Sequence, residues 1–434
     1  MKKNGFTLVE ITVCVVLLVT IFLIVVPKVN TMINNKKKNA YNSLISTVKD
    51  AAQAYVYLNV NIVDDAIESQ GYYEVSIRTL QENELLENKL ENPLTGKNIP
   101  STSIVKIIKN NEEYIYKFSL DYQYLLEHII DLYSSEETRT SNGLKKDNTP
   151  DQNIRYYGSD PNNYVKFNNE LWRIIGVFGN NVKLVRKDSL GSLSWDSSES
   201  SVNNGFGVNE WSQSALKNYL NTMYYGGTSV TCYNGQNKKE VTCPTGIIDE
   251  TAKTLIDNYT WNTGAITWND ATIVNQEAGE LKTIPFYNAE RGSVNGKICT
   301  GGSICNDTVE RTTTWTGYVG LPYVTDWAYA SSESVCETNM WDGDIDTTHG
   351  RFNMTCKNNN WMHRSNNTWY LSPCTYSFSD GASHVWNVGN MGYVSFGSAA
   401  YTYAVVPSIY LKSNVLIESG AGTSSDPYIL KAGA

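Results

Sequence analysis

The sequence predicts an α+β protein with a long, membrane-spanning amino-terminal helix, a small α/β head and a larger, mainly antiparallel-β, loop-rich domain. Three observations support this fold class. Residues 6–26 form an apolar run that contains one charged residue. Residues 29–58 continue with apolar side chains at steps of three and four, the period of an amphipathic helix. Residues 154–430 consist of short runs of β-type residues separated by turns rich in Asn, Gly and Ser.

Length and charge limit the possible functions. The chain has 434 residues, which is enough for two or three domains with a proper core. Its formal net charge is −9, from 35 basic and 44 acidic residues. Because nucleic-acid binding depends on clustered Lys and Arg, this balance argues against a DNA or RNA partner.

The apolar run 6–26 is the predicted membrane-spanning segment. Its 21 residues would form a helix of about 31 Å, and a bilayer core is about 30 Å thick. A secretory signal peptide would instead carry a shorter apolar stretch, followed by a small-residue cleavage site. Pro27 follows the run and would bend the helix, because proline removes one backbone hydrogen bond. We therefore expect this helix to hold the chain in a membrane.

Glu10 is the one charged residue of the run. A carboxylate at the membrane centre costs about 2.5–3.5 kcal/mol and needs a partner, although one in the first helical turn would be favoured by the helix dipole. The segment Gly5-Phe6-Thr-Leu-Val-Glu10 resembles the leader of type IV prepilins and pseudopilins. This resemblance implies that residues 1–5 are a leader peptide, that a prepilin peptidase cuts between Gly5 and Phe6, and that the new amino terminus is methylated. It also implies that Glu10 faces the amine of Phe6 on a neighbouring subunit during filament assembly, and that the helix bends at Pro27.

The residues before the distal domain divide into an arm, a head and a linker. The resemblance implies that residues 6–58 form the pilin helix, with one face on the head and the other on neighbouring subunits. Residues 59–133 form the predicted small pilin head, which includes a β-hairpin at 105–118 and a helix at 121–133. Residues 134–153 are polar and predict a linker.

The distal region begins with three predicted strands. The runs 164–167, 171–177 and 182–185 are joined by short turns that contain Asn and Gly, which predicts an antiparallel meander. A capped amphipathic helix is expected at 211–221, with Ser212 as its N-cap.

The distal region, 154–434, resembles uncharacterised surface domains of Firmicutes, which are distantly similar to the C-type-lectin-like and sulfatase-modifying-factor folds. The motifs that carry this resemblance are Tyr164-Val165-Lys166-Phe167, Leu171-Trp172-Arg173-Ile174-Ile175-Gly176, Trp211-Ser212, Val405-Val406-Pro407-Ser408-Ile409-Tyr410-Leu411 and Asp426-Pro427-Tyr428. The sulfatase-modifying-factor fold would imply a reactive cysteine pair. Cys336 and Cys374 are candidates for this pair, but their spacing in the sequence does not support it.

Seven of the eight cysteines fall in the distal region. Their proximity in sequence predicts three disulfides with Cys374 left over or competing for a partner: Cys232–Cys243, Cys299–Cys305 and Cys336–Cys356. Zinc binding would call for Cys-x-x-Cys or nearby His residues, which the sequence lacks. Disulfides are typical of exported domains, so this pattern favours an extracellular location.

Asp342, Asp344 and Asp346 stand at alternate positions and could surround Ca²⁺. An EF-hand loop is excluded, because Thr347 stands where that loop needs Gly and Asn353 where it needs Glu. A solvated acidic loop is the simpler interpretation. No other cofactor is expected.

The sequence contains no motif that indicates catalysis. It lacks a phosphate loop, Gly-x-Ser-x-Gly and His-Glu-x-x-His, so we do not expect an enzyme. Three pairs of tryptophans could either form a sugar-stacking face or pack in the core: Trp261 with Trp268, Trp327 with Trp341, and Trp361 with Trp369.

Together these features predict a type IV pilin-like, minor filament subunit that displays a surface-binding or adhesin domain. It would lie in the cell membrane before assembly and then on an extracellular pilus or the cell surface. The expected partners are other pilin subunits, the prepilin peptidase, the membrane and a glycan or host-surface ligand. The alternative is a pseudopilin of a type II secretion or DNA-uptake apparatus, in which the distal domain is a structural spacer.

Overall fold

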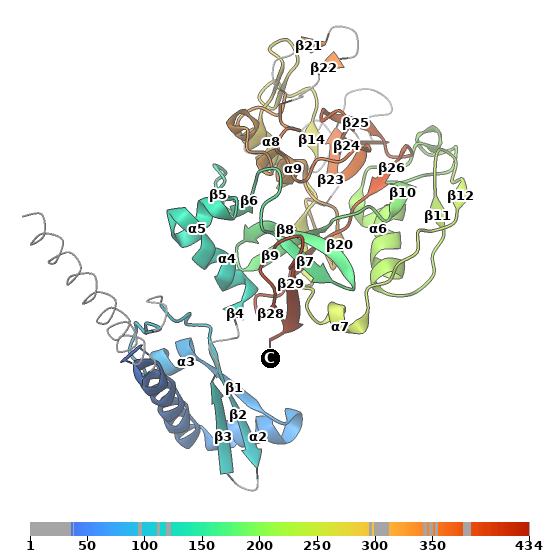
Figure 1. Ribbon diagram of the computed structural model, residues 1–434. Helices are drawn as coiled ribbons and strands as arrows, with labels where there is room; N and C mark the ends of the chain where they lie inside the picture. Colours follow the sequence, from blue (N-terminus) through green and yellow to red (C-terminus); the bar gives the residue numbers. More distant parts are fainter. Residues whose placement is uncertain are drawn as a thin grey trace, which may run out of the picture. The chain divides into compact units, whose positions relative to one another are not determined.

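The computed structural model describes residues 36–433 with gaps (Figure 1). The residues within this range that it does not describe are 38, 94–97, 111–112, 119–122, 295–296, 299–311, 342–344, 347–349, 352–354 and 376–382. The chain divides into two compact units, Met1–Gln123 and Tyr124–Ala434.

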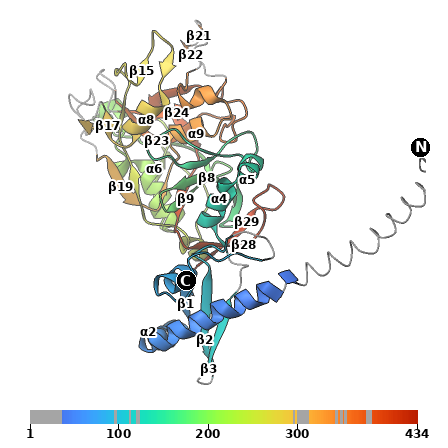
Figure 2. The ribbon, with the colours of Figure 1, turned by 90° about the vertical axis from the view of Figure 1, so that its left-hand side faces the viewer.

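The first unit packs an amphipathic helix against a small sheet. Helical residues run from 39 to 58, followed by α2 (Val60–Gln70) and α3 (Ile77–Glu82). β1 (Tyr73–Ser76), β2 (Ile104–Asn110) and β3 (Glu113–Phe118) form an antiparallel sheet in the order β1-β2-β3. Figure 2 shows the first helix lying across these strands.

The core of the first unit follows from the period of this helix. Val48, Ala52 and Val56 recur at four-residue steps and are fully or almost fully buried. They belong to the same apolar cluster as Val105 and Ile107, which alternate on one face of β2.

The predicted fold class is wrong. It required a membrane-spanning pilin helix over 6–58, but only the helical residues between 36 and 58 are described, and the predicted span 6–26 lies outside the described residues. Among the described residues, no helix combines the length and the apolar character needed to cross a bilayer. The described helix buries one stripe only, because its remaining positions are largely polar.

The larger unit is built on two mixed sheets, in which most of the described strand pairs are antiparallel and three are parallel. The first has ten strands in the order β20-β27-β9-β8-β7-β29-β28-β4, with β6 beside β8 and β5 beside β6. These strands are β4 (Gln123–Tyr124), β5 (Leu144–Lys146), β6 (Ile154–Tyr156), β7 (Tyr164–Phe167), β8 (Glu170–Phe178), β9 (Asn181–Arg186), β20 (Val319–Gly320), β27 (Ser408–Leu411), β28 (Val415–Ser419) and β29 (Tyr428–Ala432). β29 runs parallel to β7.

The second sheet has six strands in the order β10-β26-β23-β24-β25, with β14 beside β23. These strands are β10 (Gly191–Ser194), β14 (Ile266–Thr267), β23 (Thr368–Thr375), β24 (His384–Val388), β25 (Val394–Ser398) and β26 (Thr402–Val405). β23 is buried along its whole length and runs parallel to both β14 and β26. Parallel pairing is typical of strands covered on both faces, which agrees with the complete burial of β23 and explains why this sheet is mixed.

Short helices and two-stranded ribbons complete the larger unit. The helices are α4 (Leu125–Ser134), α5 (Glu136–Ser141), η1 (Asn203–Gly205), η2 (Trp211–Gln213), α6 (Ala215–Asn218), η3 (Tyr219–Tyr225), α7 (Glu250–Lys253), α8 (Thr283–Glu290), α9 (Val324–Tyr329) and η4 (Ser334–Glu337). The ribbons are β11 (Cys232–Tyr233) with β12 (Glu240–Val241), β13 (Tyr259–Asn262) with β19 (Thr314–Gly317), β15 (Val274–Asn275) with β16 (Glu280–Leu281), β17 (Ser293–Val294) with β18 (Lys297–Ile298), and β21 (Ile345–Asp346) with β22 (Gly350–Arg351).

The predicted meander is confirmed, because β7, β8 and β9 pair antiparallel in that order. The predicted helix at 211–221 is broken into η2, α6 and η3. Ser214, which has an extended backbone, separates the first two, and its side chain accepts a hydrogen bond from the backbone N–H of Lys217. Ser214, and not the predicted Ser212, is therefore the N-cap of α6.

The segment predicted as a linker, 134–153, is structured. It contains α5 and β5, and β5 pairs antiparallel with β6. Asp147, in the turn that follows β5, is 4% exposed. Three polar residues of this segment, Asp147, Thr149 and Asn153, are buried and hydrogen-bonded to one another, a possibility that their composition does not distinguish from solvation.

The predicted tryptophan pairs belong to the core and do not form a shared, exposed sugar-stacking face. Five of the six tryptophans are buried, and the sixth, Trp268, is half-buried. Trp315, which belongs to none of the pairs, is also half-buried. Four of the ring N–H groups of the six paired tryptophans donate to backbone carbonyl oxygens, for example that of Trp261 to Gly317 at 3.0 Å. The ring N–H of the buried Trp327 has no partner among the described residues. The large apolar area of an indole ring explains this preference for the interior.

Candidate functional site

Several predicted site residues lie outside the described residues: Gly5, Phe6, Glu10, Pro27, Cys299, Cys305, Asp342 and Asp344. Asp346 lies in β21, whose backbone is described. Among the described residues, no group of three or more His, Cys, Asp or Glu side chains is arranged to hold a metal ion. Leader cleavage, assembly through Glu10 and calcium binding stay predictions.

Two of the predicted disulfides are confirmed, Cys232–Cys243 and Cys336–Cys356, with Cα–Cα distances of 5.2 and 5.7 Å. Cys374 is buried in β23, with its Sγ 3.8 Å from the carbonyl oxygen of Thr375. Because Cys336 is bonded to Cys356, the reactive pair considered for Cys336 and Cys374 is not formed.

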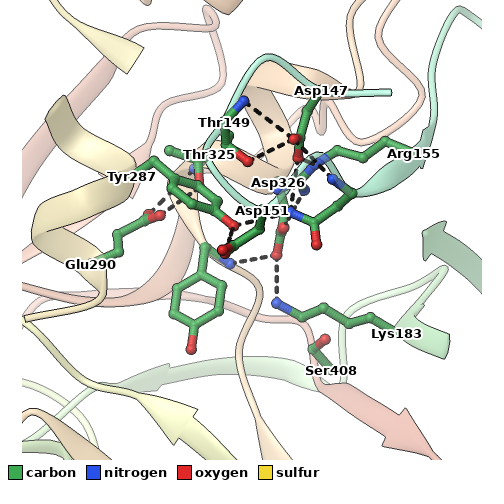
Figure 3. Close-up of polar contacts among 12 residues, drawn as sticks. Asp147, Thr149, Asp151, Arg155, Lys183, Tyr287, Glu290, Thr325, Asp326 and Ser408 are labelled. Carbon is green, nitrogen blue, oxygen red and sulfur yellow. Dashed lines mark hydrogen bonds and ion pairs between the residues drawn. The ribbon is translucent and has the colours of Figure 1, made fainter. Parts of the chain in front are cut away.

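Four charged side chains are buried together in the larger unit (Figure 3). Arg155 in β6 donates from Nε to Asp147 at 2.6 Å and from Nη1 to Asp326 at 2.7 Å. Lys183 in β9 donates from Nζ to the other oxygen of Asp326 at 2.6 Å. Each of these side chains is at most 1% exposed. We call these four residues the buried charge network.

Local structure fixes the two carboxylates of this network. Asp326 lies in the first turn of α9 and accepts a hydrogen bond from the backbone N–H of Tyr323 at 2.9 Å. Asp147 accepts hydrogen bonds from Thr149 Oγ1 at 2.6 Å and from the backbone N–H of Asn153 at 3.0 Å. The turn between β5 and β6 is therefore organised around one carboxylate.

The charges of the network compensate one another. Burial would raise the pKa of Asp326, but Lys183 and Arg155 outweigh burial and hold this pKa below its ordinary value. Burial lowers the pKa of Lys183 to about 8, although Asp326 opposes the shift. Two cations therefore face two anions at neutral pH. Since none of these side chains is accessible to a substrate, we assign the network a structural role, joining β6, β9 and α9 to the turn after β5.

Glu290, at the end of α8, is a further buried carboxyl group near the network (Figure 3). It accepts hydrogen bonds from the hydroxyl and the backbone N–H of Thr325, the latter at 3.3 Å. Burial raises the pKa of Glu290 to about 7. Its protonation state therefore changes near neutral pH.

A cavity of about 450 Å³ in the larger unit has the volume of a small-ligand site. We call it the cationic pocket, because three basic residues and a single carboxylate are among the residues that line it: Arg173, Lys187, Asp188, Ser189, Trp361, His363, Arg364, Ser365, Asn366 and Ala404. β8, the turn after β9, the segment before β23 and β26 supply these residues.

Arg173 is held in place at this pocket. Its Nε donates to the side-chain oxygen of Asn163, and its Nη2 lies 3.2 Å from Asp160 Oδ1. The guanidinium carbon lies 3.7 Å from the ring centroid of Tyr164 and 4.9 Å from that of Trp361. With its side chain 7% exposed, Arg173 is positioned before any ligand binds.

Backbone carbonyl groups hold Arg364 in the same way. Its Nη2 donates to the carbonyl oxygen of Arg186 at 3.0 Å, and its Nη1 donates to that of Lys187. Trp361, three residues earlier, is fixed by a hydrogen bond of 2.9 Å from its Nε1 to the carbonyl oxygen of Tyr156.

The electrostatics of the cationic pocket favour a negative ligand. Burial lowers the pKa of Arg173 to about 10 and also lowers the pKa of Arg364. The protein therefore stabilises the charged form of these two side chains less well than water does. Burial and, to a smaller extent, Lys357 lower the pKa of His363, so its imidazole is neutral near pH 7. An anion in the pocket would compensate the arginine charges.

Sequence reasoning missed the cationic pocket. Arg173 belongs to a strand motif that sequence analysis singled out, but as a fold signature and not as a ligand contact. The lining residues are scattered from position 173 to position 404, and only the pairing of the strands brings them together. The one local indication of this pocket was Arg173, a basic residue within an otherwise apolar predicted strand.

Comparisons of this chain with protein-family models, with curated proteins and with solved structures find no match. Its function is therefore inferred from its own residues.

Proposed function

We propose that this protein is an exported surface subunit of the type IV prepilin class, and that its larger unit is a non-catalytic ligand-binding module. The observation that carries the proposal is the cationic pocket, whose arginines are fixed in a cavity of about 450 Å³. Preorganised polar groups in a cavity of this volume are typical of binding sites.

Export is supported by the disulfides of the larger unit. Cys232–Cys243 and Cys336–Cys356 each close a loop within this unit. Disulfides form and persist outside the reducing cytosol, so an extracellular location accounts for both.

Membership of the prepilin class is supported by the amino-terminal segment. Gly5 and Phe6 stand where a prepilin peptidase would cut, and Glu10 stands where it would pair with the amine of Phe6 on a neighbouring subunit. The proposed partners are therefore the peptidase and other subunits of a filament.

A binding role is favoured over catalysis by the side chains of the cationic pocket. Ser189, Ser365 and His363 line it, but among the described residues neither serine hydroxyl is hydrogen-bonded to the imidazole. The described lining therefore offers groups that can hold a ligand, and a binding role is the one we propose.

Processing and surface exposure test the proposal together. The full chain with a carboxy-terminal tag would be expressed in its native host, and intact cells would be treated with an external protease. We expect mass spectrometry to find a chain that begins with methylated Phe6, and the protease to remove the tag.

A Gly5→Leu variant should keep Met1, because a bulky residue would block the cut, whereas the neighbouring Asn4→Ala variant should be processed normally. Retention of Met1 in the unchanged chain, or a tag protected from protease in intact cells, would contradict the proposal.

A further inference from the structure

The hydrogen-bond donors of the cationic pocket are only partly used by the protein. Arg173 uses Nε and Nη2, and Arg364 uses Nη1 and Nη2, for the contacts given above. No described residue accepts a hydrogen bond from Arg173 Nη1 or from Arg364 Nε. Lys187 is exposed at the rim and adds a third cation. These donors can serve a ligand.

The charge of the lining selects the kind of ligand. Arg173, Lys187 and Arg364 contribute three positive charges, and Asp188 contributes the one negative charge of the lining residues. Asp160 also contacts Arg173, but it is 60% exposed and screened by solvent. This local excess of positive charge lies in a chain with a net charge of −9. It favours a ligand that carries an acidic group.

The volume and the remaining side chains describe the rest of the ligand. A cavity of about 450 Å³ is larger than a bare inorganic anion requires. Ser189, Ser365 and Asn366 are exposed in the lining and offer hydroxyl and amide groups, while Trp361 and Ala404 provide limited apolar surface. Such a mixture suits a ring with several hydroxyl groups better than an apolar molecule.

We propose that the cationic pocket binds an acidic sugar, with its carboxylate or phosphate group between Arg173 and Arg364 and its hydroxyl groups against Ser189, Ser365 and Asn366. This inference rests on the proposed function only in taking the pocket as the binding site. It does not depend on export or on leader cleavage.

Isothermal titration of the purified full chain tests the inference with four probes: glucuronate, glucose 6-phosphate, glucose and inorganic phosphate. We expect at least one of the two acidic sugars to bind at least about tenfold more tightly than glucose and inorganic phosphate, since a hydrogen bond to a charged group contributes about that factor. Which acidic sugar binds better distinguishes a carboxylate from a phosphate ligand.

Two pocket variants and one control complete the test. Arg364→Gln and Lys187→Gln should each weaken binding of the acidic sugar, the first by about tenfold or more. Lys187 is exposed, so its variant keeps the test valid even if Arg364→Gln disturbs the fold. Lys166→Gln removes an exposed charge of β7 outside the lining and should bind as the unchanged chain does.

Three results would overturn the inference: no binding of either acidic sugar, equal binding of glucose, or equal binding of inorganic phosphate. Acidic-sugar binding that Lys187→Gln and Arg364→Gln leave unchanged would place the ligand elsewhere and would overturn it as well. The proposed function is contradicted by a different result, namely a chain that is not processed or that remains inside the cell.

Discussion

Asp326 binds both buried cations of the larger unit, Lys183 and Arg155. The Asp326→Asn variant keeps the shape of the side chain but leaves two buried cations with one carboxylate. Removing one partner from such a group costs about 3–5 kcal/mol, so we expect the free energy of unfolding to fall by about that amount. Urea denaturation measures it. Glu418→Gln, at an exposed position of β28, is the control, and unchanged stability of Asp326→Asn would contradict the structural role of the network.

Glu290 predicts a pH dependence of stability. Its pKa is about 7 in the folded protein, raised by burial from an ordinary value of 4.5. The folded state therefore binds the proton more tightly, and this contribution is fully present below about pH 4.5 and is lost as the pH rises through about 7. We expect the unchanged chain to lose stability between pH 5 and pH 8 more steeply than the Glu290→Gln variant, whose side chain cannot ionise. Urea denaturation at both pH values checks this, and identical slopes would refute it.

At the scale of the elements, short ribbons depend on covalent links. β11 and β12 have two residues each and form a sheet of their own, and Cys232–Cys243 ties β11 to the residues just after β12. Replacing both cysteines by alanine should lower the free energy of unfolding by about 2–4 kcal/mol, because the bridge restricts the unfolded chain.

Thermal unfolding of this double variant measures the loss. Peptide mapping of the unchanged protein without reductant provides the control, since both thiols should resist alkylation. Alkylation of Cys232 and Cys243 under those conditions would show that the bridge is absent.

At the scale of the whole molecule, the position of the boundary between the units can be tested. The structure begins the larger unit at Tyr124, whereas sequence composition begins it at residue 154. A fragment 124–434 retains Asp147 and the strand β5, but a fragment 154–434 leaves Arg155 with Asp326 as its one anionic partner. We expect the first fragment to unfold cooperatively and the second to be strongly destabilised.

Near-ultraviolet circular dichroism during urea unfolding compares the two fragments. Equal stability of the two would restore the sequence-based boundary and would show that Asp147 contributes little.

Features that depend on neighbours along the chain can be predicted from the residues alone. The sequence of residues 164–186 predicts the antiparallel meander, because alternating apolar positions and two short turns specify the pairing of adjacent strands. The pairs Cys232–Cys243 and Cys336–Cys356 follow from short loops in the same way. The amphipathic period of residues 39–58 likewise indicates which of its side chains are buried.

Which charged side chains contact one another depends on long-range packing. Asp326 lies 143 residues from Lys183 and 171 from Arg155, and Arg364 lies 177 from Lys187. The polar composition of residues 134–153 predicted a solvent-exposed linker. Local sequence does not show whether a polar side chain forms its hydrogen bonds with water or with a distant residue. Burial of a charge is favourable only when that partner is present. The buried charge network, the interior tryptophans and the cationic pocket therefore arise from long-range packing, which no local pattern of residues records.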